Sequence, residues 1–142
     1  MKLDLAFKAL LVDDDVDVLS SMAEVLRGRG YDVEIAQSAE DGLDRLGASR
    51  FQLVISDYKL PGNTGAWMLQ EAAKAGLLGV AKVLLITAEV NPEGVSGLRI
   101  LRKPFEVDLF LREVFGPGVP NAAEELTLAA IDGDRPEPPQ NE

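Results

Sequence analysis

The sequence contains no cysteine and no histidine among its 142 residues. Without cysteine the chain can form neither a disulfide nor a thiolate metal site, and without histidine the usual zinc sites and histidine-based catalysis are excluded. Any metal ion must therefore be held by oxygen ligands. Positive charge is also scarce, with 14 Lys and Arg against 24 Asp and Glu, a net charge of −10. This balance disfavours non-specific binding to nucleic acid and to anionic membranes, and we expect neither as a partner.

Long apolar runs are missing as well. No stretch approaches the roughly 18 apolar residues of a membrane-spanning helix, and residues 1–10 lack the apolar segment and cleavage site of a signal peptide. We therefore expect a cytoplasmic protein. With 46% hydrophobic residues, a chain of 142 residues can form one compact domain around a single sizeable core.

Strand-like and helix-like segments alternate along the chain. The apolar pattern predicts strands within residues 9–12, 31–37, 51–56, 82–87 and 98–103. Helical spacing predicts a helix after the first, second, third and fifth of these, the last ending near Gly116. Almost wholly apolar strands are typical of a parallel sheet covered on both faces, and the alternation implies right-handed crossovers. The predicted fold is α/β, with a doubly wound five-stranded parallel sheet.

The composition changes after Gly116. Residues 117–142 carry six acidic residues and one Arg, so they account for −5 of the net charge. We expect one domain at residues 1–116 and an acidic C-terminal extension at 117–142. Residues 121–131 of this extension could form a short helix, and the remainder is expected to be a disordered tail.

Polar residues stand at the predicted carboxyl ends of the strands, which a parallel sheet brings to one edge. Asp13 and Asp14 follow the first strand and Asp57 the third, Thr87 ends the fourth, and Lys103 follows the fifth. Two unit charges about 4 Å apart repel by about 4 kcal/mol at an effective dielectric near 20, so clustered carboxylates need compensation. A hard cation such as Mg²⁺ supplies it. Carboxylates, a hydroxyl and an amine around Mg²⁺ predict phosphoryl transfer through an aspartyl phosphate.

Each of these residues also has an ordinary structural interpretation. An Asp after a strand is frequently only a helix cap or a turn former. We expect this of Asp15 and Asp17, whose negative charge complements the dipole of the first helix. A lone strand-end threonine or surface lysine needs no functional explanation. The functional interpretation therefore depends on the convergence of the set.

Four motifs then stand in a familiar order: "LLVDDD", "VISDYKLPGNTG", "VLLITA" and "LRKPF". In residues 7–115 the chain closely resembles the receiver domain of two-component response regulators. The resemblance implies a flavodoxin-like fold and a phosphoprotein in signal transduction or a phosphorelay. It implies that Asp57 accepts a phosphoryl group from a histidine kinase or a histidine phosphotransfer protein. The domain would signal through a protein partner and would not be an enzyme, with at most slow autodephosphorylation.

The resemblance also implies a metal site. Mg²⁺ would be bound by Asp14, by Asp57 and by the backbone carbonyl of Lys59, with Asp13 contributing through water. The side chain of Lys59 matters little for such a site because its main chain supplies the ligand.

The same resemblance assigns roles to two further residues. Thr87 would hydrogen-bond one phosphoryl oxygen, and Lys103 would pair with another. The bond between Lys103 and Pro104 is expected to be cis, as is typical of the family, since a cis bond aims the amine into the site.

Two departures from the family bear on signalling. The family normally has a full helix between the threonine and the lysine, but residues 88–97 are few and contain "NPEGVSG". Pro and Gly oppose regular helix, so we expect this fourth helix to be shortened or missing. Ile100 stands where many members carry a switching Tyr or Phe, so the usual coupling between threonine and an aromatic residue cannot operate. Residues 88–97, aided by the extension at 117–142, are the expected output surface.

Three other functions stay open at this point. The chain could be a receiver-like binding module that is not phosphorylated, or the terminal receiver of a hybrid sensor kinase. Haloacid-dehalogenase-like phosphatases also use a strand-end Asp with Mg²⁺, but their motif would need Thr or Val at the position of Asp17. That mismatch disfavours the phosphatase.

Overall fold

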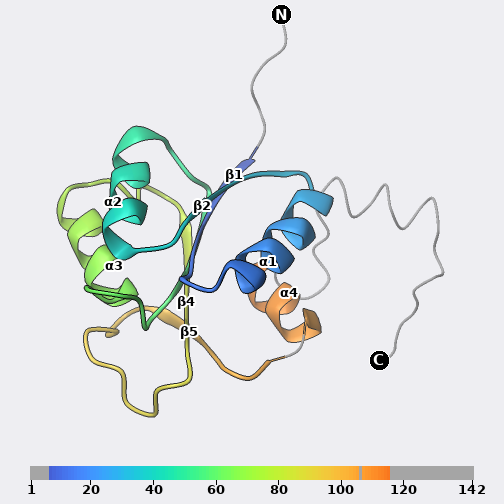
Figure 1. Ribbon diagram of the computed structural model, residues 1–142. Coiled ribbons are helices and arrows are strands. Elements are labelled where there is room, and N and C mark those ends of the chain that lie inside the picture. The colour runs from blue at the N-terminus through green and yellow to red at the C-terminus, as the bar shows by residue number, and fades with distance from the viewer. Residues whose placement is uncertain (1–6, 106, 116–142) are drawn as a thin grey trace, which may run out of the picture.

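A computed structural model describes residues 7–105 and 107–115 of the chain. In this part, strands and helices alternate as the sequence pattern predicts, and they are shown in Figure 1. The elements are β1 (Phe7–Val12), α1 (Val16–Gly28), β2 (Tyr31–Ala36), α2 (Ala39–Ala48), β3 (Leu53–Asp57), α3 (Gly65–Lys74), β4 (Lys82–Thr87), β5 (Arg99–Arg102) and α4 (Val107–Phe115).

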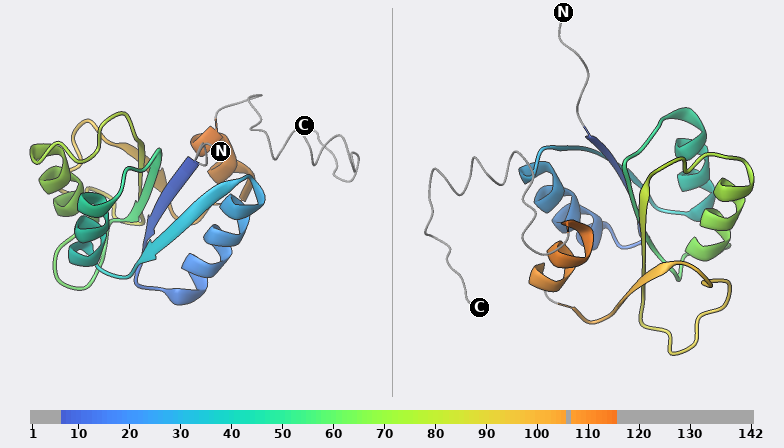
Figure 2. Two further views of the ribbon diagram at one scale, coloured as in Figure 1. Left: turned by 90° about the horizontal axis from the view of Figure 1, so that it is seen from above. Right: turned by 180° about the vertical axis from the view of Figure 1, so that it is seen from behind.

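The strands form one parallel sheet in the order β2-β1-β3-β4-β5. Helices α1 and α4 cover one face and α2 and α3 the other, as the two further views of Figure 2 show. The chain changes direction across the sheet between β1 and β3, because β2 lies on one side of β1 and β3, β4 and β5 lie on the other. The predicted doubly wound α/β fold is confirmed, and a topological switch point lies at β1 and β3.

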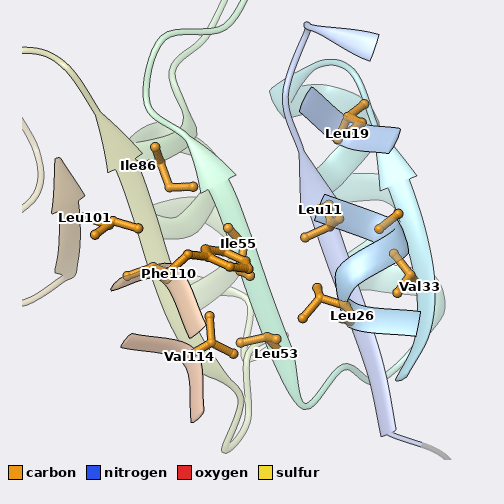
Figure 3. Packing of buried hydrophobic residues seen from close by; sticks show 13 residues of the cluster. Leu11, Leu19, Leu26, Val33, Leu53, Ile55, Ile86, Leu101, Phe110 and Val114 are labelled. Atoms are coloured by element: carbon orange, nitrogen blue, oxygen red, sulfur yellow. The ribbon is translucent and has the colours of Figure 1, made fainter. Parts of the chain in front are cut away.

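Neighbouring residues of each strand point to opposite faces, so the sheet separates two apolar clusters. Ala9 and Leu11 of β1 face α1 and α4, whereas Leu10 and Val12 face α2 and α3. Figure 3 shows the first cluster, in which Phe110 of α4 lies over the middle of the sheet. Burial of both faces explains why the central strands are apolar throughout.

Three of the helices have an N-cap residue whose side chain accepts hydrogen bonds from backbone N–H groups of the first turn. Asp15 accepts hydrogen bonds from the backbone N–H groups of Asp17 and Val18, at 3.0 and 3.3 Å. Ser38 Oγ accepts from the N–H of Asp41, and Thr64 Oγ1 from the N–H of Trp67. The expected capping role of Asp15 is therefore confirmed, and these caps set where each helix leaves its strand.

The connection between β4 and β5 differs from the others. Residues 88–98, which we call the β4–β5 loop, contain no helix and appear at the bottom of Figure 1. The prediction of a shortened or missing fourth helix is confirmed. The expected extension at 117–142 and its helix at 121–131 lie outside the described residues. Among the helices that are described, none has the length and apolar character needed to cross a membrane.

Candidate functional site

The carboxyl edge of the sheet carries the five predicted strand-end residues. Asp13 directly follows β1, Asp57 ends β3, Thr87 ends β4 and Lys103 directly follows β5. Asp57, Thr87 and Lys103 line one pocket of about 350 Å³ together with Asp14. The remaining residues of its wall are Lys59, Ala88 and Glu89. The structure therefore brings together residues that are up to 90 positions apart in the chain.

Three carboxylates meet at the switch point. Asp13, Asp14 and Asp57 each offer an oxygen, and these oxygens all lie within 4.8 Å of one another. Asp13 and Asp57 are buried, with 4% and 7% of their surface exposed, whereas Asp14 faces solvent. Buried carboxylates at this separation repel strongly unless a positive charge lies among them.

Burial disfavours the charged form of Asp13. Burial raises the pKa of this carboxyl from 3.8 to about 6, and the nearby charge of Asp57 acts in the same direction. The N–H of Asp15 donates to Asp13 Oδ1 at 2.9 Å and opposes the rise in pKa. The folded protein therefore favours the ionised form of Asp13 less than water does. A cation beside the carboxylate would stabilise that ionised form.

Lys103 supplies one positive charge to the cluster. Its Nζ lies 3.1 Å from Asp57 Oδ1, and the Lys103–Pro104 peptide bond is cis. Burial raises the pKa of Asp57, while the hydrogen bond and charge of Lys103 lower it. Lys103 also donates its backbone N–H to the carbonyl of Thr87 at 2.9 Å, which fixes the residue beside the end of β4.

Thr87 presents its hydroxyl at the same edge. The residue is buried, and its Oγ1 accepts a hydrogen bond of 2.9 Å from the N–H of Glu89. This bond occupies a lone pair of the oxygen and leaves the hydroxyl hydrogen for donation. A group seated in the pocket beside Asp57 can therefore accept a hydrogen bond from Thr87.

The backbone around Asp57 depends on a glycine that sequence reasoning missed. A Cβ on Gly65 would lie 2.2 Å from the carbonyl oxygen of Asp57 and 2.5 Å from Ser56 Oγ. The N–H of Gly65 donates to the carbonyl of Tyr58, and the N–H of Tyr58 donates to the carbonyl of Ile86. These contacts fix the turn after β3. The only sequence signal was the Thr64–Gly65 pair that begins α3.

The donor set of the cluster fits Mg²⁺. All side-chain donors are carboxylate oxygens, which are the ligands this hard cation takes. Two direct ligands of one Mg²⁺ at about 2.1 Å lie at most about 4.2 Å apart. Oxygens that all lie within 4.8 Å of one another are close enough to share one ion, directly or through water.

The family model of the response regulator receiver domain matches residues 9–112. The chain belongs to this family. Its membership implies a phosphoacceptor role in two-component signalling and interaction with histidine kinases or phosphotransfer proteins.

Solved receiver structures resemble this receiver closely. A CheY-like receiver domain protein from Methanospirillum hungatei is 31% identical with a TM-score of 0.69, covering 76% of this chain and 90% of that one. The receiver domain of the hybrid histidine kinase CckA is 32% identical with a TM-score of 0.64, covering 74% and 93%. The transcriptional regulatory protein DltR of Streptococcus agalactiae is 28% identical over 113 residues, or 75% of this chain and 50% of DltR. This receiver spans at most half the length of DltR and of other curated relatives that it matches.

Proposed function

We propose that this receiver accepts a phosphoryl group on Asp57 in a Mg²⁺-dependent reaction and signals through a protein partner. The observation that carries the proposal is the contact of 3.1 Å between Lys103 Nζ and Asp57 Oδ1 in a pocket that Asp14 and Thr87 also line. A buried carboxylate in the wall of a pocket that an ammonium and a hydroxyl also line is placed to act as a nucleophile. The donor would be a histidine kinase or a histidine phosphotransfer protein.

In the proposed reaction, a carboxylate oxygen of Asp57 attacks the phosphorus of a phosphohistidine. The P–N bond breaks, its electron pair stays on the histidine nitrogen, and an acyl phosphate forms on Asp57. Asp14, Asp57 and the backbone carbonyl of Lys59 would hold Mg²⁺, with Asp13 bound through water. When bound, the ion would neutralise the charge on the phosphoryl oxygens.

Thr87 and Lys103 act on the product. Phosphorylation of Asp57 places oxygens and about two negative charges in the pocket. Lys103 would exchange its contact with the carboxylate for a phosphoryl oxygen, and the Thr87 hydroxyl would donate to another. Both changes pull on the ends of β4 and β5, and so bias the conformation of the β4–β5 loop between them.

Intact-mass measurement after incubation with acetyl phosphate and Mg²⁺ tests the proposal. We expect one phosphoryl adduct on the wild type and none on Asp57→Asn or in the presence of EDTA. The matched control Asp17→Asn removes an exposed carboxylate at the start of α1 and is expected to be phosphorylated normally. Sustained release of phosphate from esters would indicate the phosphatase instead. Absence of both an adduct and Mg²⁺ affinity would indicate a binding module that is not phosphorylated.

Two further parts of the proposal concern context. The likeness to the CckA receiver is consistent with the terminal receiver of a hybrid sensor kinase as the alternative setting for the same chemistry. The cytoplasmic location and the domain limits at 1–116 and 117–142 stay predictions. Cell fractionation tests the first, and limited proteolysis with mass analysis tests the second.

A further inference from the structure

The β4–β5 loop is held in place by polar contacts from three different elements. In a doubly wound fold a crossover helix usually buries an apolar side against the sheet. Here only Val95 and Leu98 of the loop pack, half-buried, against the cluster under α2 and α3. Instead, the backbone of the loop forms hydrogen bonds with side chains of β5, α3 and the turn after Asp57.

Arg102 of β5 binds the start of the loop. Its two terminal nitrogens donate to the carbonyls of Glu89 and Val90, the second at 3.1 Å. The N–H of Glu89 in turn donates to Thr87 Oγ1. The backbone of Glu89 is thus fixed on both sides, by the residue before Lys103 and by the hydroxyl at the pocket.

Tyr58 binds the middle of the loop from the opposite side. It directly follows Asp57, and its phenolic oxygen accepts a hydrogen bond of 3.1 Å from the N–H of Glu93. Gln70 of α3 donates to the carbonyl of the next residue, Gly94, at 2.7 Å, where the backbone has φ +76°. The loop is therefore tied to β5 at its start and to Tyr58 and α3 at its middle.

The position of the loop determines what surrounds Asp57. Ala88 and Glu89 belong to the wall of the pocket that Asp57, Thr87 and Lys103 line. Two of the residues that hold the loop are direct chain neighbours of residues in this pocket, because Tyr58 follows Asp57 and Arg102 precedes Lys103. Any movement of the loop away from Arg102 would open this wall and release the lone pair of Thr87 Oγ1.

Resting on the proposed function, we propose that Arg102 and Tyr58 are positioning residues that keep the β4–β5 loop in place at the wall of the Asp57 pocket and thereby slow the loss of the phosphoryl group. In that loss, a water oxygen attacks phosphorus and the bond from phosphorus to the Asp57 oxygen breaks. The carboxylate is regained and inorganic phosphate leaves, with the proton of the water passing to phosphate or solvent. A closed loop limits the approach of that water and keeps Thr87 oriented for donation.

The test compares the decay of the adduct in Arg102→Ala and Tyr58→Phe with the wild type, after phosphorylation by acetyl phosphate and removal of the donor. We expect decay about fivefold faster in Arg102→Ala, as loss of one or two ordinary hydrogen bonds to the loop predicts. Tyr58→Phe, which removes one hydroxyl, should show a smaller change in the same direction. Arg102→Lys keeps the charge and one donor group and should restore part of the lifetime.

Two matched controls separate positioning from a general loss of structure. Arg99→Ala removes an exposed arginine of the same strand whose side chain pairs with Glu113 of α4 at 3.2 Å. Tyr31→Phe removes a phenolic hydroxyl on the far side of the sheet, where the ring packs against Phe115. The phosphoryl adduct of both control variants should decay at the wild-type rate.

Hydrogen exchange of the unphosphorylated proteins provides an independent readout. Amides of residues 88–98 should exchange faster in Arg102→Ala and Tyr58→Phe than in the wild type, with no change in the controls. Unchanged exchange would overturn the proposal, and so would faster exchange with a wild-type decay rate. If the wild type forms no phosphoryl adduct, the proposed function is overturned. The proposed effect of the loop on adduct decay is then overturned as well. The two failures are therefore distinguishable.

Discussion

The two halves of the carboxyl edge are built in different ways. The half formed by β1 and β3 carries the acidic cluster on buried strands, and its turn leaves no room for a Cβ at Gly65. The half formed by β4 and β5 carries Thr87, Lys103 and a loop without a helix, held by hydrogen bonds between its backbone and side chains of neighbouring elements. Dense packing tolerates little movement, whereas a few polar contacts near solvent exchange easily. The first half is therefore suited to hold a reacting group and the second to change when that group is modified.

The largest effect is expected where the first half is packed most tightly. Gly65→Ala forces a methyl group against the Asp57 carbonyl, so we expect a loss of about 3 kcal/mol in the free energy of unfolding. Urea denaturation measures it. The control Gly47→Ala places a methyl where no heavy atom lies within 4 Å, in a helix that favours Ala, and should not destabilise. A small loss at Gly65 would show that the β1–β3 half is no more rigid than the other.

The acidic cluster gives the first half a dependence on pH. The pKa of Asp13 rises from 3.8 in the unfolded chain to about 6 on folding, so the folded state binds more protons between these values. The free energy of unfolding should therefore fall as pH rises from about 4 to about 6, by up to about 3 kcal/mol without Mg²⁺.

Asp13→Asn removes this titration because an amide does not ionise. The amide oxygen can still accept the hydrogen bond from the N–H of Asp15. We expect the variant to be about 2 kcal/mol more stable than the wild type at pH 7.5 in EDTA. Urea denaturation at several pH values, with and without Mg²⁺, measures the difference. The exposed Asp32→Asn serves as control. An identical pH profile for the wild type and Asp13→Asn would contradict the prediction.

Lys103 joins the two halves, so its loss should separate chemistry from response. Lys103→Ala removes the partner of a buried carboxylate, but the lysine is 36% exposed and solvent screens the pair, so we expect a cost of only about 1 kcal/mol. Mg²⁺ binding should remain, because no metal ligand is lost.

The deciding readout for Lys103→Ala is amide exchange before and after phosphorylation. The change in residues 88–98 that phosphate causes in the wild type should be absent, whereas Lys74→Ala, which alters a distant exposed lysine, should keep it. The same phosphate-dependent change in Lys103→Ala would show that the halves communicate by another route.

The smallest effect is expected in the loop. Val95→Ala trims a half-buried side chain, so we expect a loss of about 0.5 kcal/mol. Leu69→Ala in α3 removes a fully buried side chain on the same face and should cost about 3 kcal/mol. Thermal or urea denaturation measures both. Equal losses would mean that the loop is packed as firmly as a crossover helix.

Much of the fold and of the candidate site could be predicted because the signals are local. The apolar strands ended where Asp13, Asp57 and Thr87 stand, and parallel strands bring such ends to one edge. The interrupted pattern "NPEGVSG" also predicted the missing helix. Gly65 was missed because its requirement comes from the distance between the start of α3 and the carbonyl of Asp57, which no local pattern records.

The sequence by itself determined the order of strands and helices along the chain, the cap of α1 by Asp15, and which polar residues lie at the strand ends, because periodicity and capping act within a few residues. Only the tertiary structure decided that Lys103 contacts Asp57, that burial raises the pKa of Asp13, and that Arg102 and Tyr58 hold the β4–β5 loop. Each of these depends on the distance between atoms far apart in the chain and on the water excluded around them, and both arise only when the sheet assembles.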